Sequence, residues 1–398
     1  MTGRTVTEES PTDASARRVA AGRATRPSTR VAALIDTGET SGPGRQLAAL
    51  ARALEARGVE LLVIMLQRRG RPSPPYAAYL ERAGVRCLVL PERGRVDLRL
   101  IGRIGDVLAD WKPDVVQTHS YKTTALAYAL RLRGARWPWI AFFHGATSED
   151  LKVKAYHWLD RRLMARADRI VVMSRAHARG FASLGDRVSV VHNAVIPLPS
   201  EAEALDVARA GASTVRPRLG VVGRLSPEKG VDVFLECCAL LRARGATFSA
   251  VIAGDGPERQ ALEAQRDRLG LADVVHFLGS VRAVRSLYPQ IDLLVIPSRS
   301  EGLPNVLLEA LGADVPVVAT EVGAVPEVLE DQDAGIVVPS ESPSALADAI
   351  VRALPMKASR RCTDARAATA ARFSLARRAE EHLRLYARVL DGREVAAT

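Results

Sequence analysis

The segment Pro297–Leu311 reads PSRSEGLPNVLLEAL and indicates a strand that leads through a turn into a helix. The apolar run Leu293–Ile296 comes directly before it and predicts a buried strand. A turn with Gly302 and Pro304 follows, and a helix is predicted to begin near Asn305. The first N–H groups of a helix have no partner inside the helix and lie at its positive end, so they can hold a diphosphate.

The same alternation of short apolar runs and helical stretches extends over most of the chain. Runs this apolar are typical of parallel strands that are buried on both faces. In the first half, strands are predicted at Val31–Ile35, Val59–Leu66, Arg86–Leu90, Val115–Gln117, Trp139–Phe143, Ile170–Met173 and Val188–Val191. In the second half, they are predicted at Arg218–Val222, Ser249–Ala253, Val274–Leu278, Leu293–Ile296, Val317–Ala319 and Gly335–Val337.

A break between the two series predicts two α/β, Rossmann-like domains that face each other across a cleft. The chain of 398 residues is long enough for two cores. The predicted parts are a disordered tail (1–29), an N-terminal domain (30–193), a linker (194–216), a C-terminal domain (217–372), and a C-terminal helix with a tail (373–398). We expect that helix to pack back toward the N-terminal domain. Open parallel sheets bind ligands beyond the carboxyl ends of their strands, so the site is expected in the cleft.

The positive charge belongs to the first half of the chain. Residues 1–197 contain 32 Lys and Arg against 18 Asp and Glu, whereas residues 198–398 contain 24 against 27. A basic surface favours anionic partners, although Arg-rich coding bias explains it equally well. The first 29 residues lack the apolar stretch of a signal peptide, and the four cysteines lack CxxC spacing, so we expect a cytoplasmic protein without a disulfide framework.

Glu301 and Glu309 form an E-x7-E motif within EGLPNVLLEALGADVPVVATEVGAVPEVL (301–329). In this setting the motif resembles the signature of family 4 of the retaining GT-B glycosyltransferases. The resemblance covers residues 30–390 and is densest in the second half. It implies a donor-binding C-terminal domain and an acceptor-binding N-terminal domain. The motif residues inherit defined roles: Glu301 orients the donor sugar, Glu309 accepts hydrogen bonds from the ribose, and the backbone of Gly302, Leu303, Pro304 and Asn305 holds the diphosphate.

Three further segments of the second half carry the resemblance. The second-half segment Val221–Gly230 reads VVGRLSPEKG. In it, Gly223 is implied to let the backbone come close to the donor, and Arg224 and Lys229 are implied to stabilise the charge that grows on the leaving diphosphate. Gly254 opens the turn GDGPE, which without this context is an ordinary strand-to-helix turn. Val281 lies in the loop that is implied to meet the nucleotide base.

The first half resembles the family more loosely. Gly42 and Gly44 belong to a glycine-rich loop after the first strand, where Pro43 interrupts the usual Gly-Gly pair. His144 follows a strand in FFHG and matches the family histidine that contacts the donor sugar. His119 and Lys122 follow another strand and are candidates for the acceptor site. Ala194 stands where the family usually has Gly.

The resemblance implies a metal-independent hexosyltransferase that retains anomeric configuration and needs no cofactor. A UDP-sugar is the favoured donor and a GDP-sugar the next candidate. The acceptor is a glycan, as in polysaccharide biosynthesis, a lipid-linked sugar or a small molecule. No nucleic acid partner is expected.

The basic stretch Lys152–Arg169 suggests peripheral contact with an anionic membrane on its inner face, or else a solvated helix face. A GT-B nucleotide-sugar epimerase and a non-enzymatic polyanion-binding module are the alternatives.

Overall fold

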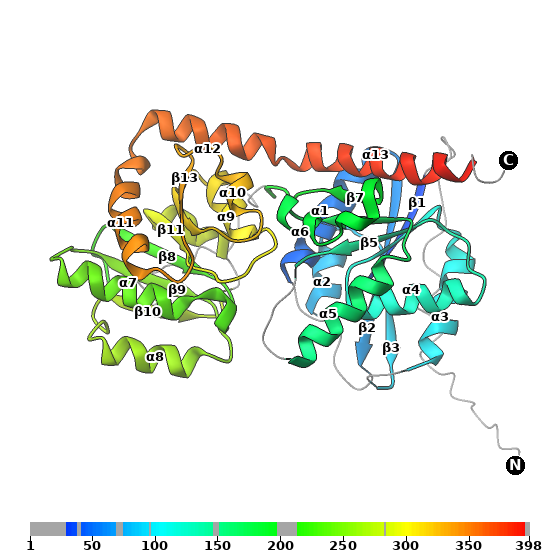
Figure 1. The fold of residues 1–398 in the computed structure, drawn as a ribbon, viewed down its shortest axis with the longest axis horizontal. Helices are drawn as coiled ribbons and strands as arrows, with labels where there is room; N and C mark the ends of the chain where they lie inside the picture. Colours follow the sequence, from blue (N-terminus) through cyan, green and yellow to red (C-terminus); the bar gives the residue numbers. More distant parts are fainter. Residues whose placement is uncertain are drawn as a thin grey trace, which may run out of the picture.

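The computed structural model describes residues 29–37, 41–68, 75–94, 97–145, 151–196, 213–281 and 284–394, without the side chains of 68, 151–157 and 392–394. The predicted N-terminal tail and most of the predicted linker lie outside these residues. Figure 1 shows two α/β lobes side by side. Within the described residues, no helix is long and apolar enough to cross a bilayer.

The first lobe is built on a parallel sheet with the strand order β3-β2-β1-β4-β5-β6-β7. Its strands are β1 (Thr29–Ile35), β2 (Val59–Arg68), β3 (Cys87–Glu92), β4 (Val115–Thr118), β5 (Trp139–Phe143), β6 (Arg169–Val172) and β7 (Val188–Val190). Its helices are α1 (Gly42–Glu55), α2 (Pro75–Arg82), α3 (Arg99–Trp111), α4 (Tyr121–Leu132), α5 (Leu151–Met164) and α6 (Arg175–Arg179), with the 3-10 turn η1 (Ala182–Arg187).

The second lobe repeats this plan with the strand order β10-β9-β8-β11-β12-β13, again all parallel. Its strands are β8 (Arg218–Val222), β9 (Ser249–Ala253), β10 (Val275–Gly279), β11 (Leu293–Ile296), β12 (Val317–Thr320) and β13 (Gly335–Val338). Its helices are α7 (Val231–Ala243), α8 (Arg259–Arg268), α9 (Asn305–Gly312), α10 (Val325–Val328) and α11 (Pro343–Ala353), with the 3-10 turns η2 (Pro227–Lys229), η3 (Val284–Gln290) and η4 (Leu354–Lys357).

The predicted two Rossmann-like domains are confirmed by these two sheets. Strands inside the two sheets are buried, as expected for strands covered on both faces: β5 and β9, neither of which is an edge strand, are buried at every residue. The sequence pattern predicts a helix at Val284–Tyr288, but this segment forms part of the 3-10 turn η3; the same pattern predicts no helix at the position of α2.

Two C-terminal helices, α12 (Arg360–Arg372) and α13 (Leu375–Glu394), join the lobes. Figure 1 shows α12 beside the second lobe and α13 running on across the first. Helix α13 packs against α1. Its side chains also reach the sheet of the first lobe, because the Gln117 amide on β4 donates a hydrogen bond to the Tyr386 hydroxyl. Side chains in the middle of α13 therefore lie near the carboxyl ends of the first sheet.

Candidate functional site

Five of the polar and glycine residues around β8 and β11 line one small cavity at the carboxyl ends of these strands. They are Gly223, Arg224, Lys229, Ser298 and Glu301. The two segments that supply them are about seventy residues apart in the chain, but β8 and β11 pair directly. The sheet therefore brings together the predicted diphosphate-binding and sugar-binding residues.

Lys229 and Glu301 form the polar centre of this cavity. The Lys229 ammonium lies 2.6 Å from Glu301 Oε1, and the Ser298 hydroxyl donates to the same oxygen over 2.9 Å. Both bonds fall on one carboxylate oxygen, so Glu301 keeps Oε2 for a further donor. Arg224 is exposed at the rim of the cavity.

Glycines shape the backbone under the cavity. Gly254 has a φ of 152°, and a Cβ there would clash with the Gly223 carbonyl oxygen. Gly230 has a φ of 62°, and a Cβ there would clash with the Pro297 carbonyl oxygen. Both positions combine a left-handed φ with a close backbone approach, and only glycine tolerates that combination without strain.

Within the described residues, the N–H groups of Asn305 and Val306 at the start of α9 have no hydrogen-bond partner, because the N-cap residue Pro304 has no side-chain acceptor to offer them. Leu303 and Pro304 are buried, and the Asn305 side chain points toward the first lobe. Asn305 Oδ1 accepts hydrogen bonds from Gln46 and from Asn193, each over 3.0 Å. A Cβ on Gly42 would lie 2.5 Å from Asn305 Nδ2. The glycine-rich loop and the predicted diphosphate site are therefore direct neighbours.

Glu309 lies deeper and is only 4 % exposed. The Tyr288 hydroxyl donates to its Oε2 over 2.7 Å, and the Arg45 guanidinium lies 3.4 Å from its Oε1. A buried carboxylate needs such partners to remain charged. Tyr288 fixes the orientation of the carboxylate, and Arg45 reaches it from the other lobe.

On the opposite wall, His144 follows β5 and His119 follows β4. His119 Nδ1 and His144 Nε2 are 3.1 Å apart, and His119 Nε2 lies 3.3 Å from Gln117 Oε1. The backbone beside His144 touches the second lobe, because a Cβ on Gly302 would clash with the His144 carbonyl oxygen. The predicted sugar-contacting histidine thus lies across from the E-x7-E loop.

These histidines are electrically neutral at neutral pH. Burial lowers the pKa of His144 to about 4, and the nearby Arg378 guanidinium adds to the effect. Burial, His144 and Arg378 hold the pKa of His119 well below its usual range. Neutral imidazoles can each donate one hydrogen bond and accept another, which suits contacts with sugar hydroxyls.

Three predicted residues are placed less centrally. Lys122 on α4 forms an ion pair with Glu92 at the end of β3, and among the described residues no hydrogen bond joins it to the His119–His144 pair. The Gly44 N–H donates to the Ser41 hydroxyl over 3.3 Å as part of the α1 cap, so it is already used. Val281 is half-buried after β10. Their predicted binding roles stay predictions.

Sequence reasoning missed Arg45, Gln46, Asn193, Tyr288 and Arg378. Arg45 ends the glycine-rich loop segment, and Asn193 stands directly before Ala194 in the segment where the family usually has Asn-Gly, but the motifs assign neither of them a role in the site. Their contacts, like those of the other three, depend on how elements distant in sequence pack together. Among the described residues, no three His, Cys, Asp or Glu side chains gather as metal ligands would.

Two family models match the chain, one over each lobe. The model for Glycosyltransferase Family 4 matches residues 40–197, and the model for Glycosyl transferases group 1 matches residues 216–355. The chain belongs to these glycosyltransferases. This family membership confirms the resemblance that the E-x7-E segment carries.

Curated relatives of this glycosyltransferase include two proteins of Streptomyces. Alpha-D-kanosaminyltransferase of Streptomyces kanamyceticus is 38% identical over 175 residues, which cover 43% of this chain and 45% of the relative. The 2-deoxystreptamine N-acetyl-D-glucosaminyltransferase of Streptomyces fradiae is 28% identical over 348 residues, which cover 76% and 79%. The match spans about half to two thirds of the length of the first three curated relatives.

Solved structures share the fold of this glycosyltransferase at low sequence identity. Anabaena HepE in complex with UDP-glucose has a TM-score of 0.75 at 21% identity, covering 91% of this chain and 99% of that one. Sucrose-phosphate synthase of Thermosynechococcus elongatus has a TM-score of 0.73 at 18% identity, covering 92% and 100%. The predicted GT-B fold is confirmed.

Proposed function

We propose that this glycosyltransferase moves a sugar from a nucleotide-diphosphate donor to an acceptor hydroxyl and retains the anomeric configuration. One observation carries the proposal. Lys229, Glu301 and the start of α9 form a single site, and the His144 loop lies against Gly302 on its other side. This arrangement offers a cation, a carboxylate and backbone N–H groups to a sugar diphosphate.

The cations act on the leaving group. In the proposed step the bond between the anomeric carbon and the diphosphate oxygen breaks, and the acceptor oxygen bonds to the same carbon from the same face. The acceptor's proton passes to an oxygen of the leaving diphosphate. Negative charge grows on that diphosphate, and Lys229, Arg224 and the backbone N–H groups of Leu303 and Asn305 stabilise it.

The carboxylates and histidine orient the donor. Glu301 uses Oε1 for Lys229 and Ser298, and its Oε2 accepts from a sugar hydroxyl. Glu309 accepts hydrogen bonds from the ribose diol. Because the Arg45 guanidinium lies beside Glu309 Oε1, it must move away from this oxygen or share it with a ribose hydroxyl. His144, neutral because its pKa is about 4, contacts the sugar from the opposite wall.

A UDP-sugar is the first donor to test. The similar fold of HepE is known in complex with UDP, with UDP and glucose, and with UDP-glucose. Small-molecule acceptors deserve the first trials, since one relative is named for its transfer to 2-deoxystreptamine.

Mass spectrometry of donor turnover tests the proposal. The protein is incubated with UDP-, GDP- and ADP-sugars, first alone and then with candidate acceptors. Slow release of the nucleotide diphosphate from one donor, accelerated by an acceptor, is expected. Conversion of a UDP-sugar into its epimer without an acceptor would instead identify a nucleotide-sugar epimerase. Once a product is available, the NMR coupling at its anomeric proton reports retention.

A further inference from the structure

The Arg45 side chain reaches from the first lobe to the second at the proposed donor site. Arg45 lies in the first turn of α1, and its Nη1 is 3.4 Å from Glu309 Oε1 on α9. Gly42, in the same turn, lies against the Asn305 side chain, because a Cβ on Gly42 would be 2.5 Å from Asn305 Nδ2. The first turn of α1 therefore runs beside the start of α9, with Arg45 opposite Glu309.

The Arg45 guanidinium has unused hydrogen-bonding capacity in this structure. Its distance of 3.4 Å to Glu309 Oε1 is longer than an ordinary N–H···O hydrogen bond of about 2.7–3.2 Å. Its Nε is buried and, within the part of the chain that the structure describes, has no hydrogen-bond partner. The side chain is 26 % exposed and is therefore within reach of a bound molecule.

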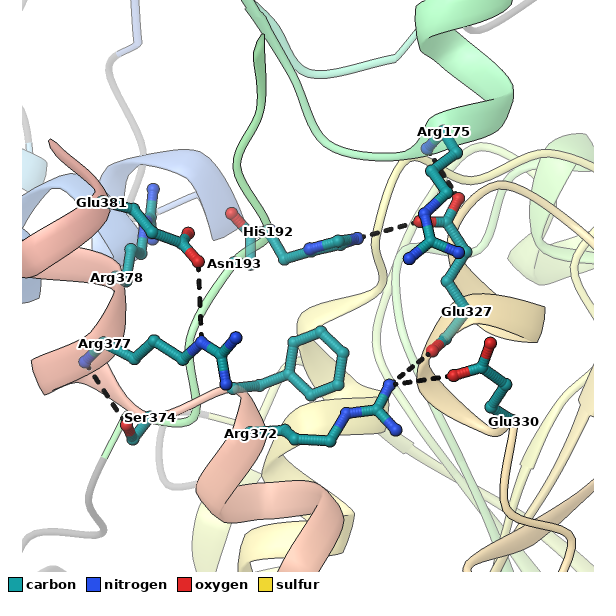
Figure 2. Close-up of a pocket in the computed structure, with 11 residues that line it drawn as sticks. Arg175, His192, Asn193, Glu327, Glu330, Arg372, Ser374, Arg377, Arg378 and Glu381 are labelled. Atoms are coloured by element: carbon teal, nitrogen blue, oxygen red, sulfur yellow. Dashed lines mark hydrogen bonds and ion pairs between the residues drawn. The ribbon is translucent and has the colours of Figure 1, made fainter. Parts of the chain in front are cut away.

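Other basic side chains at the boundary of the lobes form hydrogen bonds. Figure 2 shows Arg372, which donates to the Glu327 carbonyl oxygen over 3.1 Å and also to the Glu330 carboxylate. In the same view, the His192 imidazole is hydrogen-bonded to the Glu327 carboxylate over 3.0 Å. Arg45 differs from these side chains, because its contact with the carboxylate opposite is an ion pair without a hydrogen bond.

Positive charge gathers around Arg45. A cation in the first turn of a helix opposes the helix dipole, whose positive end lies there. The start of α9 is a second positive end, and at 1.5 Å per residue Asn305 is about 6 Å from Glu309 along the helix axis. A nucleotide whose ribose binds Glu309 and whose diphosphate binds the start of α9 therefore has its phosphates beside Arg45.

We propose that Arg45 binds the diphosphate of the nucleotide-sugar donor from the first lobe, while the ribose takes its place at Glu309. This role rests on the proposed function, since it needs a nucleotide diphosphate at the start of α9. A guanidinium binds phosphate oxygens through paired N–H groups, and the Arg45 Nε–H gains the acceptor that it lacks here. Arg45 thus exchanges Glu309 for the diphosphate, and the donor links the two lobes.

Binding of UDP and of uridine to the full chain separates a phosphate contact from a ribose contact. GDP and ADP, each with its nucleoside, replace this pair if the wild type does not bind UDP. Isothermal titration calorimetry measures the dissociation constants, with the nucleoside in competition against the diphosphate. The variants are Arg45→Gln and Arg45→Lys. Arg52→Gln is the matched control, because Arg52 is exposed on the same helix and pairs with Glu55.

We expect R45Q to bind UDP at least tenfold more weakly than R52Q, because a charged contact with the diphosphate is lost. Uridine has no phosphate and is expected to bind R45Q as tightly as R52Q or more tightly, since Arg45 no longer competes for Glu309. R45K keeps the charge without the paired N–H groups, so its affinity for UDP falls between those of R45Q and R52Q. Thermal unfolding checks that each variant is folded.

Two results would overturn this role of Arg45. The first is binding of UDP by R45Q within threefold of R52Q. The second is an equal loss of affinity for UDP and for uridine in R45Q, which would place the effect on the ribose through Glu309. If R45Q fails to fold, R45K decides, and affinity for UDP equal to that of R52Q excludes the paired contact.

Lys229→Ala distinguishes these results from a failure of the proposed function. Weaker binding of UDP by K229A, together with unchanged binding by R45Q, would keep the proposed donor site and remove Arg45 from it. No binding of UDP, GDP or ADP to the wild type at millimolar concentration would remove the proposed function and the role of Arg45 together.

Discussion

At the scale of single residues, Lys229 carries the most specific prediction. Its ammonium lies 2.6 Å from Glu301 and faces the cavity predicted for the diphosphate. We expect Lys229→Ala to lower kcat by about 10², since a fixed cation acts on charge that develops in the transition state. Steady-state turnover at saturating donor measures this effect.

Arg242→Ala serves as the matched control for that variant. Arg242 pairs with Asp273 on the surface of the same lobe, so its loss removes a cation without touching the site. Turnover of K229A within threefold of R242A would remove Lys229 from the mechanism. Equal unfolding temperatures of the two variants show that both are folded.

The buried imidazole of His382 makes the free energy of unfolding depend on pH. It is fully buried on α13, its Nδ1 donates to the Arg378 carbonyl oxygen, and it faces Phe142, Tyr386 and the Arg378 guanidinium. Burial lowers its pKa to about 3, so the unfolded chain binds a proton that the folded chain does not between pH 3 and about 6.5. Stability is therefore lost as the pH falls through this window.

We expect His382→Gln to reduce the slope of the free energy of unfolding against pH by up to about 1.4 kcal/mol per pH unit, the free-energy equivalent of one proton. Urea unfolding of both proteins at pH 7, 6 and 5 measures it. Parallel pH profiles for the two proteins would show that His382 is not the titrating group. The pKa values of His144 and His119 are also lowered, so part of the dependence of stability on pH remains in the wild type and in the variant.

The sequence predicts candidate site residues in local motifs and leaves out those that distant elements bring beside them. Arg224, Lys229 and Glu301 stand in recognisable segments, and the pairing of β8 with β11 brings them together. Arg45 and Tyr288 meet Glu309 from α1 and η3. No periodicity or motif encodes contacts of this kind, because they depend on how the two lobes pack.

At the scale of elements, the buried strands were the best predicted part. Strands β5, β8, β9 and β11 have the bounds expected from their apolar runs. Helix α12 was missed because it buries Cys362, Arg366 and Thr369 and so lacks an apolar stripe. The Arg366 guanidinium, fully buried, pairs with Asp314 over 2.7 Å, and an ion pair takes the place of an apolar contact there.

Alanine substitutions at two glycines of similar backbone conformation distinguish the cost of a left-handed φ from the cost of a steric clash. Gly230 and Gly270 have φ values of 62° and 68°. A Cβ would meet nothing within 4 Å at Gly270 but would clash with the Pro297 carbonyl at Gly230. Gly270→Ala is expected to cost about 1–2 kcal/mol, the usual strain of a left-handed residue, and Gly230→Ala at least twice as much.

Thermal and urea unfolding of the two alanine variants measures this difference. G230A should also lose donor turnover, because the η2 turn that presents Lys229 must shift, while G270A keeps it. Equal destabilisation by both substitutions would mean that the contact between η2 and the β11 loop is looser than described.

At the scale of the whole molecule, the distribution of cations bears on membrane contact. Several basic side chains of the first lobe are already engaged: Arg131 pairs with Asp168, and the Arg161 guanidinium lies 5.6 Å from the Phe143 ring centroid. Beside them, Trp158 is 59 % exposed and Leu159 47 %. The side chains of Lys152 and Lys154 lie outside the described residues.

We expect weak, salt-dependent binding of this lobe to phosphatidylglycerol vesicles. Each basic residue near an anionic surface contributes about 1 kcal/mol, and this attraction is screened over about 8 Å at physiological salt. Co-sedimentation at low and at physiological salt measures it, with phosphatidylcholine vesicles as control. Equal recovery with both lipids would rule out electrostatic attachment and favour a soluble acceptor.

In the proposed function, the diphosphate of a nucleotide-sugar lies between the Lys229 segment (223–230) and the start of α9. Hydrogen–deuterium exchange with mass spectrometry, with and without UDP, tests it most directly. We expect UDP-dependent protection of the amides in 223–230 and 301–309, with no change in the α3 helix of the first lobe. Unchanged exchange in both segments at saturating UDP, or protection confined to other parts of the chain, would contradict it.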